Sequence, residues 1–262
     1  MIRNKKNRCN FCGKTIELSE EVALLQENIA IPLINSGFRY NKKVKPIKDP
    51  LGSYRWKACM SCFTEMKDQV VQIKKQESLK YGSFTDRRKN KNYKTIKIGD
   101  QVWMAENLAY KPIHIMFATN KGNKYYSIKP YGMKESNIEE NGYLYDYYSA
   151  KAVCPDGWHL PTVEEFQVLL KNTGGEGFEA FRALRSGGYS GFNATFSGFY
   201  VSDRYSNLGD SGGYWTSSQK DFKSKYSENY ATGVFFYGKR KKVLVNSLCN
   251  INWGLSVRCI KD

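Results

Sequence analysis

Residues 154–162 read CPDGWHLPT and lead directly into VEEFQVLLKN, and this stretch organises the C-terminal part of the chain. Thr162 followed three residues later by Glu165 is a capping box, in which each side chain bonds the other residue's backbone N–H at a helix start. Apolar residues then recur at positions 166, 169 and 170, and the pair Gly174-Gly175 ends the pattern. The sequence therefore predicts a helix that begins after Thr162 and ends before the glycine pair.

Outward from this helix, the sequence predicts short strands, turns and one further helix. Residues 93–99 alternate at period two and residues 102–104 follow a Gly-Asp turn, which predicts a hairpin at the start of the domain. Residues 143–153 carry apolar side chains at helical spacing and predict a helix. Brief aromatic stretches separated by glycines fill the remainder. The fold class that follows is α+β with long loops, over residues 83–262.

Five strings in this region occur together and in order. They are TIKIG at 95–99, WMAENL at 103–108, CPDGWHLPT at 154–162, GYWTSS at 213–218 and SVRC at 256–259. Together they resemble the FISUMP family, the Fibrobacter succinogenes major paralogous domain, from about residue 84 to the C-terminus. The resemblance implies a C-type-lectin-like fold, which is shared with the formylglycine-generating-enzyme family and leaves long loops free to vary on a fixed core.

The resemblance also implies a binding role, because the family has no agreed enzyme activity. The same fold serves as the variable, target-binding protein of diversity-generating retroelements, whose variable surface is rich in Asn, Tyr, Ser and Asp. Residues 214–253 have that composition, and tyrosine with small polar residues suits a binding surface. An ordinary polar sheet face with half-buried tyrosines is the alternative. The expected contact residues are Tyr214, Trp215, Tyr226, Asn229, Tyr230, Phe235, Tyr237, Asn246, Asn250 and Asn252.

Two further cysteines take their role from the same resemblance. The lectin-like pattern places the first helix region beside the last strand, so Cys154 and Cys259 are expected to be neighbours. They would form a disulfide in oxidising surroundings and remain free thiols otherwise. The remaining cysteine, Cys249, has no partner that the sequence indicates.

Four cysteines in the N-terminal part form two C-x-x-C pairs, Cys9 with Cys12 and Cys59 with Cys62. Two such turns can converge on one tetrahedral ion, so this spacing predicts a structural zinc site. Two redox dithiols or disulfides are the alternative. The first pair resembles the zinc-binding domain of ClpX-type unfoldases, and an apolar stripe at helical spacing after the second pair, running on to Gly82, indicates a treble-clef finger.

The zinc module is expected to span residues 1–82, with a long insert between the cysteine pairs. The polar and basic residues 84–92 are expected to form the end of a linker and the approach to the first strand. Residues 1–82 carry 16 basic and 8 acidic side chains, and the rest carries 25 and 17, so each part has a formal charge of +8. Because the charge is spread over both parts, it indicates no single basic stripe.

The charge still leaves nucleic acid as a second class of partner. The chain has 41 Lys and Arg against 25 Asp and Glu, with basic runs at 87–89 and 239–242 that could neutralise phosphates. A protein ligand is the first expectation, and nucleic-acid binding by a basic zinc-finger protein is the alternative. A carbohydrate ligand has no support, because the calcium-site strings E-P-N and W-N-D are missing from the sequence.

Other classes are disfavoured by the same sequence. The chain has only two histidines, His114 and His159, and no phosphate-binding G-x-x-x-x-G-K-[ST] loop, so no catalytic constellation emerges. A formylglycine-generating-like enzyme is the weakest reading. No run of about 18 apolar residues and no apolar N-terminal stretch occurs, which predicts a cytoplasmic protein, or one carried in a phage particle, without a membrane partner.

Overall fold

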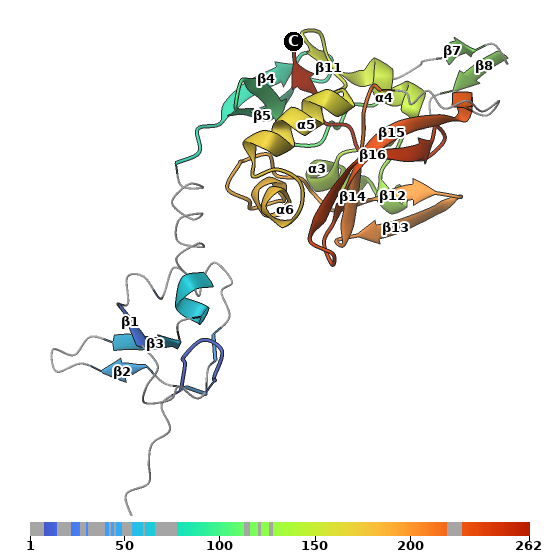
Figure 1. Cartoon of the computed structure of the whole chain (residues 1–262). Coiled ribbons are helices and arrows are strands. Elements are labelled where there is room, and N and C mark those ends of the chain that lie inside the picture. The colour runs from blue at the N-terminus through green and yellow to red at the C-terminus, as the bar shows by residue number, and fades with distance from the viewer. Residues whose placement is uncertain are drawn as a thin grey trace, which may run out of the picture. The chain divides into compact units, whose positions relative to one another are not determined.

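The computed structural model describes residues 8–14, 22–26, 30, 40–41, 43–44, 46–48, 54–59, 61–65, 78–112, 116–119, 122–125, 128–218 and 227–262. The chain forms two compact units, Met1–Glu77 and Ser78–Asp262 (Figure 1). The second unit begins a few residues before the expected boundary at residue 82. Leu79 packs against the core of that unit, and the Tyr81 hydroxyl accepts a 3.0 Å hydrogen bond from Asn193 Nδ2.

The first unit contains a small antiparallel sheet in the order β1-β3-β2. Its strands are β1 (Val22–Gln26), β2 (Ile47–Lys48) and β3 (Tyr54–Cys59). Residues 61–65 form a helical turn directly after β3. The expected continuation of this helix over residues 66–77 lies outside the described residues. Gly82 does not end a helix, because it is the first residue of β4 in the second unit.

The second unit opens with a five-stranded sheet in the order β11-β17-β6-β5-β4. The strands are β4 (Gly82–Asp86), β5 (Lys91–Ile98), β6 (Gln101–Met104), β11 (Trp158–His159) and β17 (Ile260–Lys261). The expected hairpin of residues 93–104 is confirmed as β5 and β6. The expected linker at 84–92 is wrong: these residues form most of β4 and its turn into β5, because Phe84 packs on Trp158 and Asp86 is buried.

A second five-stranded sheet has the order β13-β12-β14-β15-β16. Its strands are β12 (Ser197–Val201), β13 (Arg204–Leu208), β14 (Ser211–Trp215), β15 (Tyr230–Tyr237) and β16 (Lys242–Asn250). All neighbours are antiparallel except β12 and β14. A register shift between Gly233 and Phe235 marks a bulge in the β15–β16 pair, and Asn246 adopts φ 61° there.

The described residues of this unit include four short α-helices: α3 (Ile138–Asn141), α4 (Tyr147–Val153), α5 (Val163–Asn172) and α6 (Phe178–Leu184). The capping box of α5 is confirmed, with both the Thr162 and the Glu165 hydrogen bonds present. The helix predicted at residues 143–153 is shorter in the structure and spans Tyr147–Val153. The first residues of the predicted segment form β10 (Leu144–Tyr145), because Tyr145 bridges to Leu255, and Asp146 then caps α4 through the Ser149 N–H.

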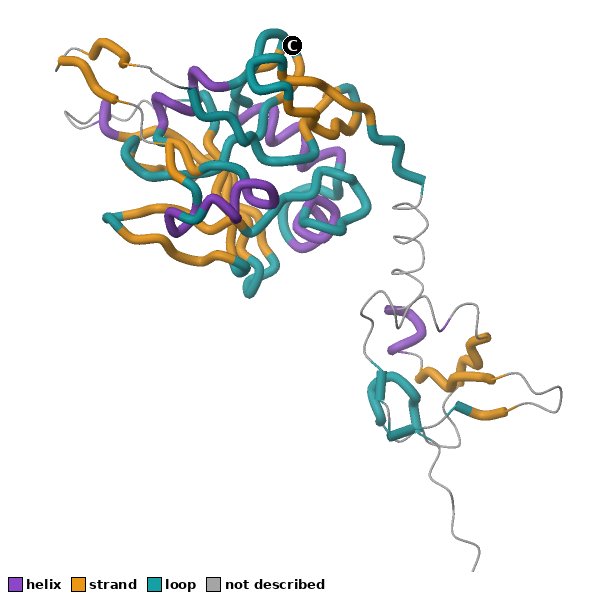
Figure 2. The backbone as a smooth tube through the Cα atoms, turned by 180° about the vertical axis from the view of Figure 1, so that it is seen from behind, coloured by secondary structure: helices purple, strands orange, loops and turns teal. Residues whose placement is uncertain are grey.

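Shorter elements complete the described part of the unit. They are β7 (Met116–Thr119), β8 (Gly122–Tyr125), β9 (Ile128–Lys129) and the 3-10 helices Tyr131–Met133, Glu135–Asn137 and Ser227–Asn229. Strands dominate over helices throughout (Figure 2). The unit is therefore a mixed α+β structure, mostly sheet.

The middle strands of the second sheet separate two hydrophobic cores. Val234 and Phe236 of β15 pack with apolar residues of α5 and α6, whereas Ala231 and Phe235 pack with apolar residues of α4. Alternate side chains of a strand point to opposite faces, so both faces of β15 are covered. This arrangement determines which residues of 214–253 remain available to a ligand.

Candidate metal centre and recognition surface

The first cysteine pair lies in a tight turn over residues 8–14. The Gly13 N–H donates to the Cys9 carbonyl at 3.0 Å, and the Cys9 N–H donates to the Lys14 carbonyl at 2.9 Å. Gly13 has φ 76°, and a Cβ there would clash with the Asn41 side chain. Glycine is favoured at this position because it adopts a positive φ without strain, which lets the chain turn directly after Cys12.

The second pair comes from the end of β3 and the helical turn that follows it. Cys59 is the last residue of β3, and Cys62 lies in the turn 61–65. The four sulfur atoms all lie within 4.8 Å of one another, and the Sγ atoms of Cys12 and Cys59 are 3.8 Å apart. Four thiolates at 2.3 Å from one tetrahedral ion have sulfurs about 3.8 Å apart. The donor set and its spacing therefore fit a metal ion.

The surroundings hold the site in a closed form. Cys9, Cys59 and Cys62 are buried and Cys12 is exposed. Asn10 Nδ2 donates to the Val44 carbonyl at 2.7 Å, which ties the first turn to the segment before β3. All four cysteines are free thiols, so neither pair forms a disulfide here. Four protein donors leave no open position on a tetrahedral ion, which is typical of a structural site.

Electrostatics favour a thiolate at one of these positions. Burial raises the pKa of the Cys9 thiol, but backbone N–H groups of Cys12, Cys59 and Phe11 outweigh it and bring the pKa to about 7. One of these contacts is a 3.5 Å hydrogen bond from the Cys59 N–H to Cys9 Sγ. Hydrogen bonds to a thiolate stabilise its charge, as metal binding requires.

Three of the expected contact residues are buried, and their assignment to a recognition surface is wrong. Tyr214 and Trp215 are 0% exposed and Phe235 is 5% exposed. The Tyr214 hydroxyl donates to the Thr195 carbonyl at 3.1 Å, and Trp215 Nε1 donates to the Tyr145 carbonyl at 2.6 Å. These side chains fill the two cores because both faces of the middle strands are covered.

Four of the expected residues lie together at the end of the β15–β16 hairpin that is opposite its turn. Tyr230 pairs with Asn250 across the two strands, and the Ile251 N–H donates to the Asn229 carbonyl at 3.0 Å. Asn250 Oδ1 accepts a 3.0 Å hydrogen bond from the Asn252 N–H. Asn252 is exposed and the other three are half-buried. We call this group, Asn229, Tyr230, Asn250 and Asn252, the Tyr230 surface.

The remaining expected residues lie elsewhere. Tyr237 is the last residue of β15, about 23 Å along the strand from Tyr230, and it is half-buried. Asn246 is exposed at the bulge of β16. Tyr226 lies outside the described residues. The structure thus divides the expected surface into one cluster and two separate positions.

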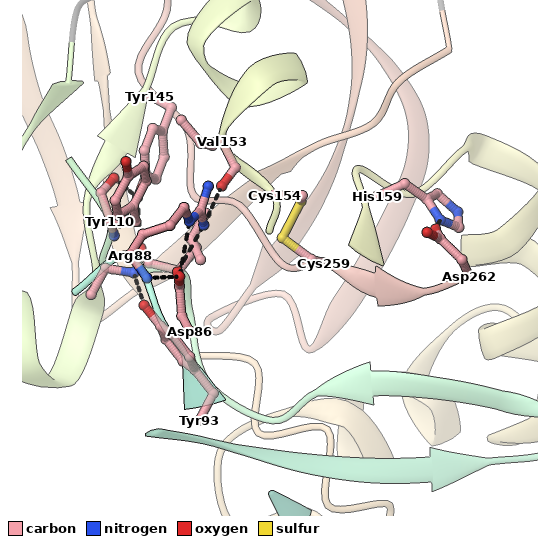
Figure 3. The surroundings of a disulfide bond; sticks show 12 residues. Asp86, Arg88, Tyr93, Tyr110, Tyr145, Val153, Cys154, His159, Cys259 and Asp262 are labelled. Atoms are coloured by element: carbon pink, nitrogen blue, oxygen red, sulfur yellow. Dashed lines mark hydrogen bonds and ion pairs between the residues drawn. A yellow bond between two sulfur atoms is a disulfide. The ribbon is translucent and has the colours of Figure 1, made fainter. Parts of the chain in front are cut away.

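The expected proximity of Cys154 and Cys259 is confirmed, and the two form a disulfide (Figure 3). The bond joins the end of α4 to the strand segment before β17. Beside it, Arg88 donates to Asp86 through Nε at 2.9 Å and Nη2 at 2.7 Å, and its Nη2 also donates to the Val153 carbonyl at 2.9 Å. The guanidinium lies 3.8 Å from the centre of the Tyr110 ring.

The Asp86–Arg88 pair is a structural feature that the sequence did not reveal, because residues 84–92 read as a linker. Burial raises the pKa of the Asp86 carboxyl, but the hydrogen bonds and charge of Arg88 outweigh it and lower the pKa below its usual value. The pair stabilises the turn between β4 and β5 and fixes it to the end of α4.

His159 lies between two carboxylates at the edge of the first sheet. Its Nδ1 is 2.6 Å from Asp262 Oδ1 (Figure 3). Its Nε2 is 2.8 Å from Glu165 Oε1, so His159 connects β11 to the capping box of α5 and to Asp262. Burial lowers the pKa of His159, but these hydrogen bonds and charges outweigh it and raise the pKa above its usual value.

Replacing His159 by glutamine is expected to lower the melting temperature by about 1–3 °C near pH 5.5 and by little near pH 8.5. A raised pKa in the folded state adds stability that is fully present below the unfolded pKa of about 6.5, and that is lost as the pH rises through the folded pKa. The effect is small because the side chain is 40% exposed. Calorimetry at both pH values measures it. Equal decreases in melting temperature at the two pH values would show that the positive charge of His159 does not contribute to stability.

Arg258 carries a charged side chain that is fully buried, at 0% exposure. Its Nε donates to Asn107 Oδ1 at 3.2 Å, and its Nη1 donates to the carbonyls of Met104, at 3.2 Å, and Phe192. The guanidinium lies 4.7 Å from the centre of the Phe192 ring. Asn107 and Arg258 belong to the strings WMAENL and SVRC. Residues of these two strings are therefore joined by hydrogen bonds in the interior of the unit.

Cys249 is a free cysteine of the second unit, outside the N-terminal cluster. It is 0% exposed, and burial raises the pKa of its thiol to about 12. The thiol therefore stays protonated and unreactive near neutral pH. Its Sγ donates to the Ser247 carbonyl at 3.3 Å.

Comparison with known proteins gives one family. The family described as Fibrobacter succinogenes major domain matches residues 96–261. No curated protein and no solved structure matches the chain. Among the described residues, no helix has the length and apolar character needed to cross a membrane.

Proposed function

The chain belongs to the Fibrobacter succinogenes major domain family, and from this membership we propose that it is a non-enzymatic binding protein whose C-type-lectin-like domain presents the Tyr230 surface to a protein ligand. The observation that carries the proposal is the clustering of Asn229, Tyr230, Asn250 and Asn252 at one end of a hairpin. Their neighbours in the same strands are buried and fix the backbone from within.

The chemistry of the Tyr230 surface suits protein recognition. Tyrosine offers a large contact area with few rotatable bonds, and asparagine offers hydrogen bonds that adapt to different partners. The Tyr230–Asn250 strand pair holds these groups on a rigid sheet, which limits the ordering entropy that binding costs. In the variable protein of a diversity-generating retroelement, Tyr226 and the Tyr230 surface would vary. Tyr214, Trp215 and Phe235 would stay constant because they fill the cores.

For the first unit, the proposal is a treble-clef finger in which Cys9, Cys12, Cys59 and Cys62 hold a structural zinc ion. The four sulfurs and their spacing support zinc, which takes tetrahedral thiolate sets in closed sites. The role of the finger would be to dock to a partner, while the second unit selects the ligand.

Alanine at Asn229, Tyr230 and Asn252 together is expected to weaken binding to the protein ligand about 30-fold or more, as loss of a hot spot does. The ligand would first be identified by mass spectrometry after capture on the full chain, and its affinity for each variant would then be measured by biolayer interferometry. The matched control replaces Tyr237 and Asn246, which have the same residue types but lie apart from the cluster. An unchanged affinity of the triple variant, with a loss in the control, would place the contact elsewhere.

A further inference from the structure

α6 lies beside β16 (Figure 1). An exposed aromatic ring of α6 lies there among cations. Phe178, the first residue of α6, is 49% exposed. Arg182 Cζ and Lys241 Nζ each lie 5.7 Å from the centre of its ring, one from the same helix and the other from the turn. Two segments more than 50 residues apart in the sequence thus place positive charge beside one phenyl ring.

The turn that carries most of this charge is held in place by backbone contacts. The Gly238 N–H donates to the Asp210 carbonyl at 2.7 Å, and the Lys241 N–H donates to the Gly238 carbonyl at 3.2 Å. A Cβ at Gly238 would lie 2.5 Å from the Asp210 carbonyl oxygen, so only glycine allows this close approach. The turn thus holds Lys241 next to Phe178, whereas Arg240 lies over the Tyr237 ring and Lys239 lies 3.8 Å from Asp210.

Cations outnumber carboxylates at this site. Lys239, Arg240, Lys241 and Lys242 are all exposed. The interacting carboxylates are Glu179, 2.7 Å from Arg182 Nη2, and Asp210, 3.8 Å from Lys239 Nζ. We call Phe178, Arg182 and the four basic residues of the run the Phe178 patch. With five cations against two carboxylates, the patch carries an excess positive charge that matches a polyanion.

We propose that the Phe178 patch binds single-stranded nucleic acid. In this arrangement a base displaces one of the two cations that lie over the Phe178 ring and stacks on the ring, and phosphates pair with the cations of the patch. Proteins that bind single strands combine aromatic platforms for the bases with basic residues for the backbone. A duplex keeps its bases stacked inside and would use only the charges. A peptide made only of acidic residues would likewise contact only the cations. The exposed ring therefore favours a single strand.

The Phe178 patch is independent of the Tyr230 surface. Tyr230 lies at the open end of the β15–β16 hairpin, and the basic run forms the turn at its other end. The strand between them spans about 23 Å. A protein ligand on one end and a nucleic-acid strand on the other would occupy different parts of the same sheet.

Fluorescence anisotropy of the full chain with a fluorescein-labelled oligothymidylate of about 15 nucleotides tests the proposal. Replacing Phe178 by leucine keeps an apolar side chain and removes the aromatic face, and it is expected to weaken binding about five-fold or more. Replacing Phe178 by tryptophan is expected to retain binding. Circular dichroism of each variant checks that the fold is unchanged.

The salt dependence separates the patch from a general effect of charge. Replacing Lys241 and Lys242 by glutamine is expected to reduce the slope of log affinity against log salt by about 0.7 for each cation removed. The control replaces Lys94 and Lys97, two exposed lysines of β5, and changes the net charge equally. This control is expected to leave the slope nearly unchanged.

Three results would overturn the proposal. The first is no binding of the oligonucleotide by the unmodified chain. The second is equal affinity of the unmodified chain and the leucine variant, together with equal salt slopes of the two lysine pairs. The third is tighter binding of a poly-glutamate peptide than of the oligonucleotide, with the same dependence on Lys241 and Lys242, because an acidic protein would then be the partner.

Discussion

Serine in place of Cys59 is expected to abolish stoichiometric zinc binding and to unfold the first unit. Apparent binding free energies of structural zinc in small fingers are about 10–16 kcal/mol near neutral pH, which is as large as the whole stability of a typical domain, about 5–15 kcal/mol. The first unit spans residues 1–77, and the hydrophobic core of a unit this small rarely supplies more than about 3–5 kcal/mol unless a metal or disulfides add to it. A zinc ion at this site would therefore supply most of the free energy that keeps β3 and the Cys9–Cys12 turn together.

Elemental analysis and limited proteolysis measure the two parts of this expectation. The purified chain should contain about one zinc ion per molecule, and a strong chelator should make the first unit sensitive to protease while the second stays resistant. Serine in place of Cys249 is the matched control, since this cysteine is buried outside the cluster. A chain that binds no zinc, or one that keeps it after the Cys59 replacement, would contradict the proposed site.

Methionine in place of Arg258 is expected to lower the free energy of unfolding of the second unit by about 4 kcal/mol. The replacement leaves Asn107 Oδ1 and the carbonyls of Met104, Phe192 and Asn193 without their donor. Each buried acceptor left unpaired costs about 1–3 kcal/mol, and the apolar methionine offsets part of the sum. A loss of this size is a large fraction of the stability of a domain.

Urea unfolding under non-reducing conditions, followed by near-ultraviolet circular dichroism, measures this loss. Methionine in place of Arg182 is the matched control, because that residue pairs with Glu179 at the surface and should cost about 1 kcal/mol or less. Lysine in place of Arg258 keeps the positive charge but loses the planar guanidinium group. Its loss of unfolding free energy should therefore lie between the losses of the two methionine variants. A change below about 1 kcal/mol in the Arg258 variant would show that the surrounding carbonyls find other donors.

Local patterns in the sequence predicted local structure well. The capping box of α5 depends on Thr162 and Glu165 alone, and the β5–β6 hairpin depends on a short alternating run and its turn. Four cysteines at C-x-x-C spacing indicated their cluster because each pair is already a tight turn. In these cases the interacting groups are close in the sequence or share one recognisable residue type.

Contacts over long sequence distances could not be predicted in this way. The expected helix at 143–153 begins late because Tyr145 bonds to Leu255, which lies 110 residues away. The hydrogen bonds between Asn107 and Arg258 span 151 residues. The prediction that Tyr214 and Trp215 lie on a surface is wrong because both faces of β14 are covered, and no local pattern in the sequence shows this. Burial in a middle strand depends on the whole sheet order.

The disulfide between Cys154 and Cys259 makes a covalent ring, since the two residues are 105 positions apart. The ring encloses α5, α6 and every strand of the second sheet, and with them the Tyr230 surface and the Phe178 patch. A single cut in any loop of the ring leaves both fragments joined. The chain can therefore accept a backbone cut or an insertion in a loop between the Tyr230 surface and the Phe178 patch. Neither half diffuses away as long as Cys154 and Cys259 remain joined by their disulfide.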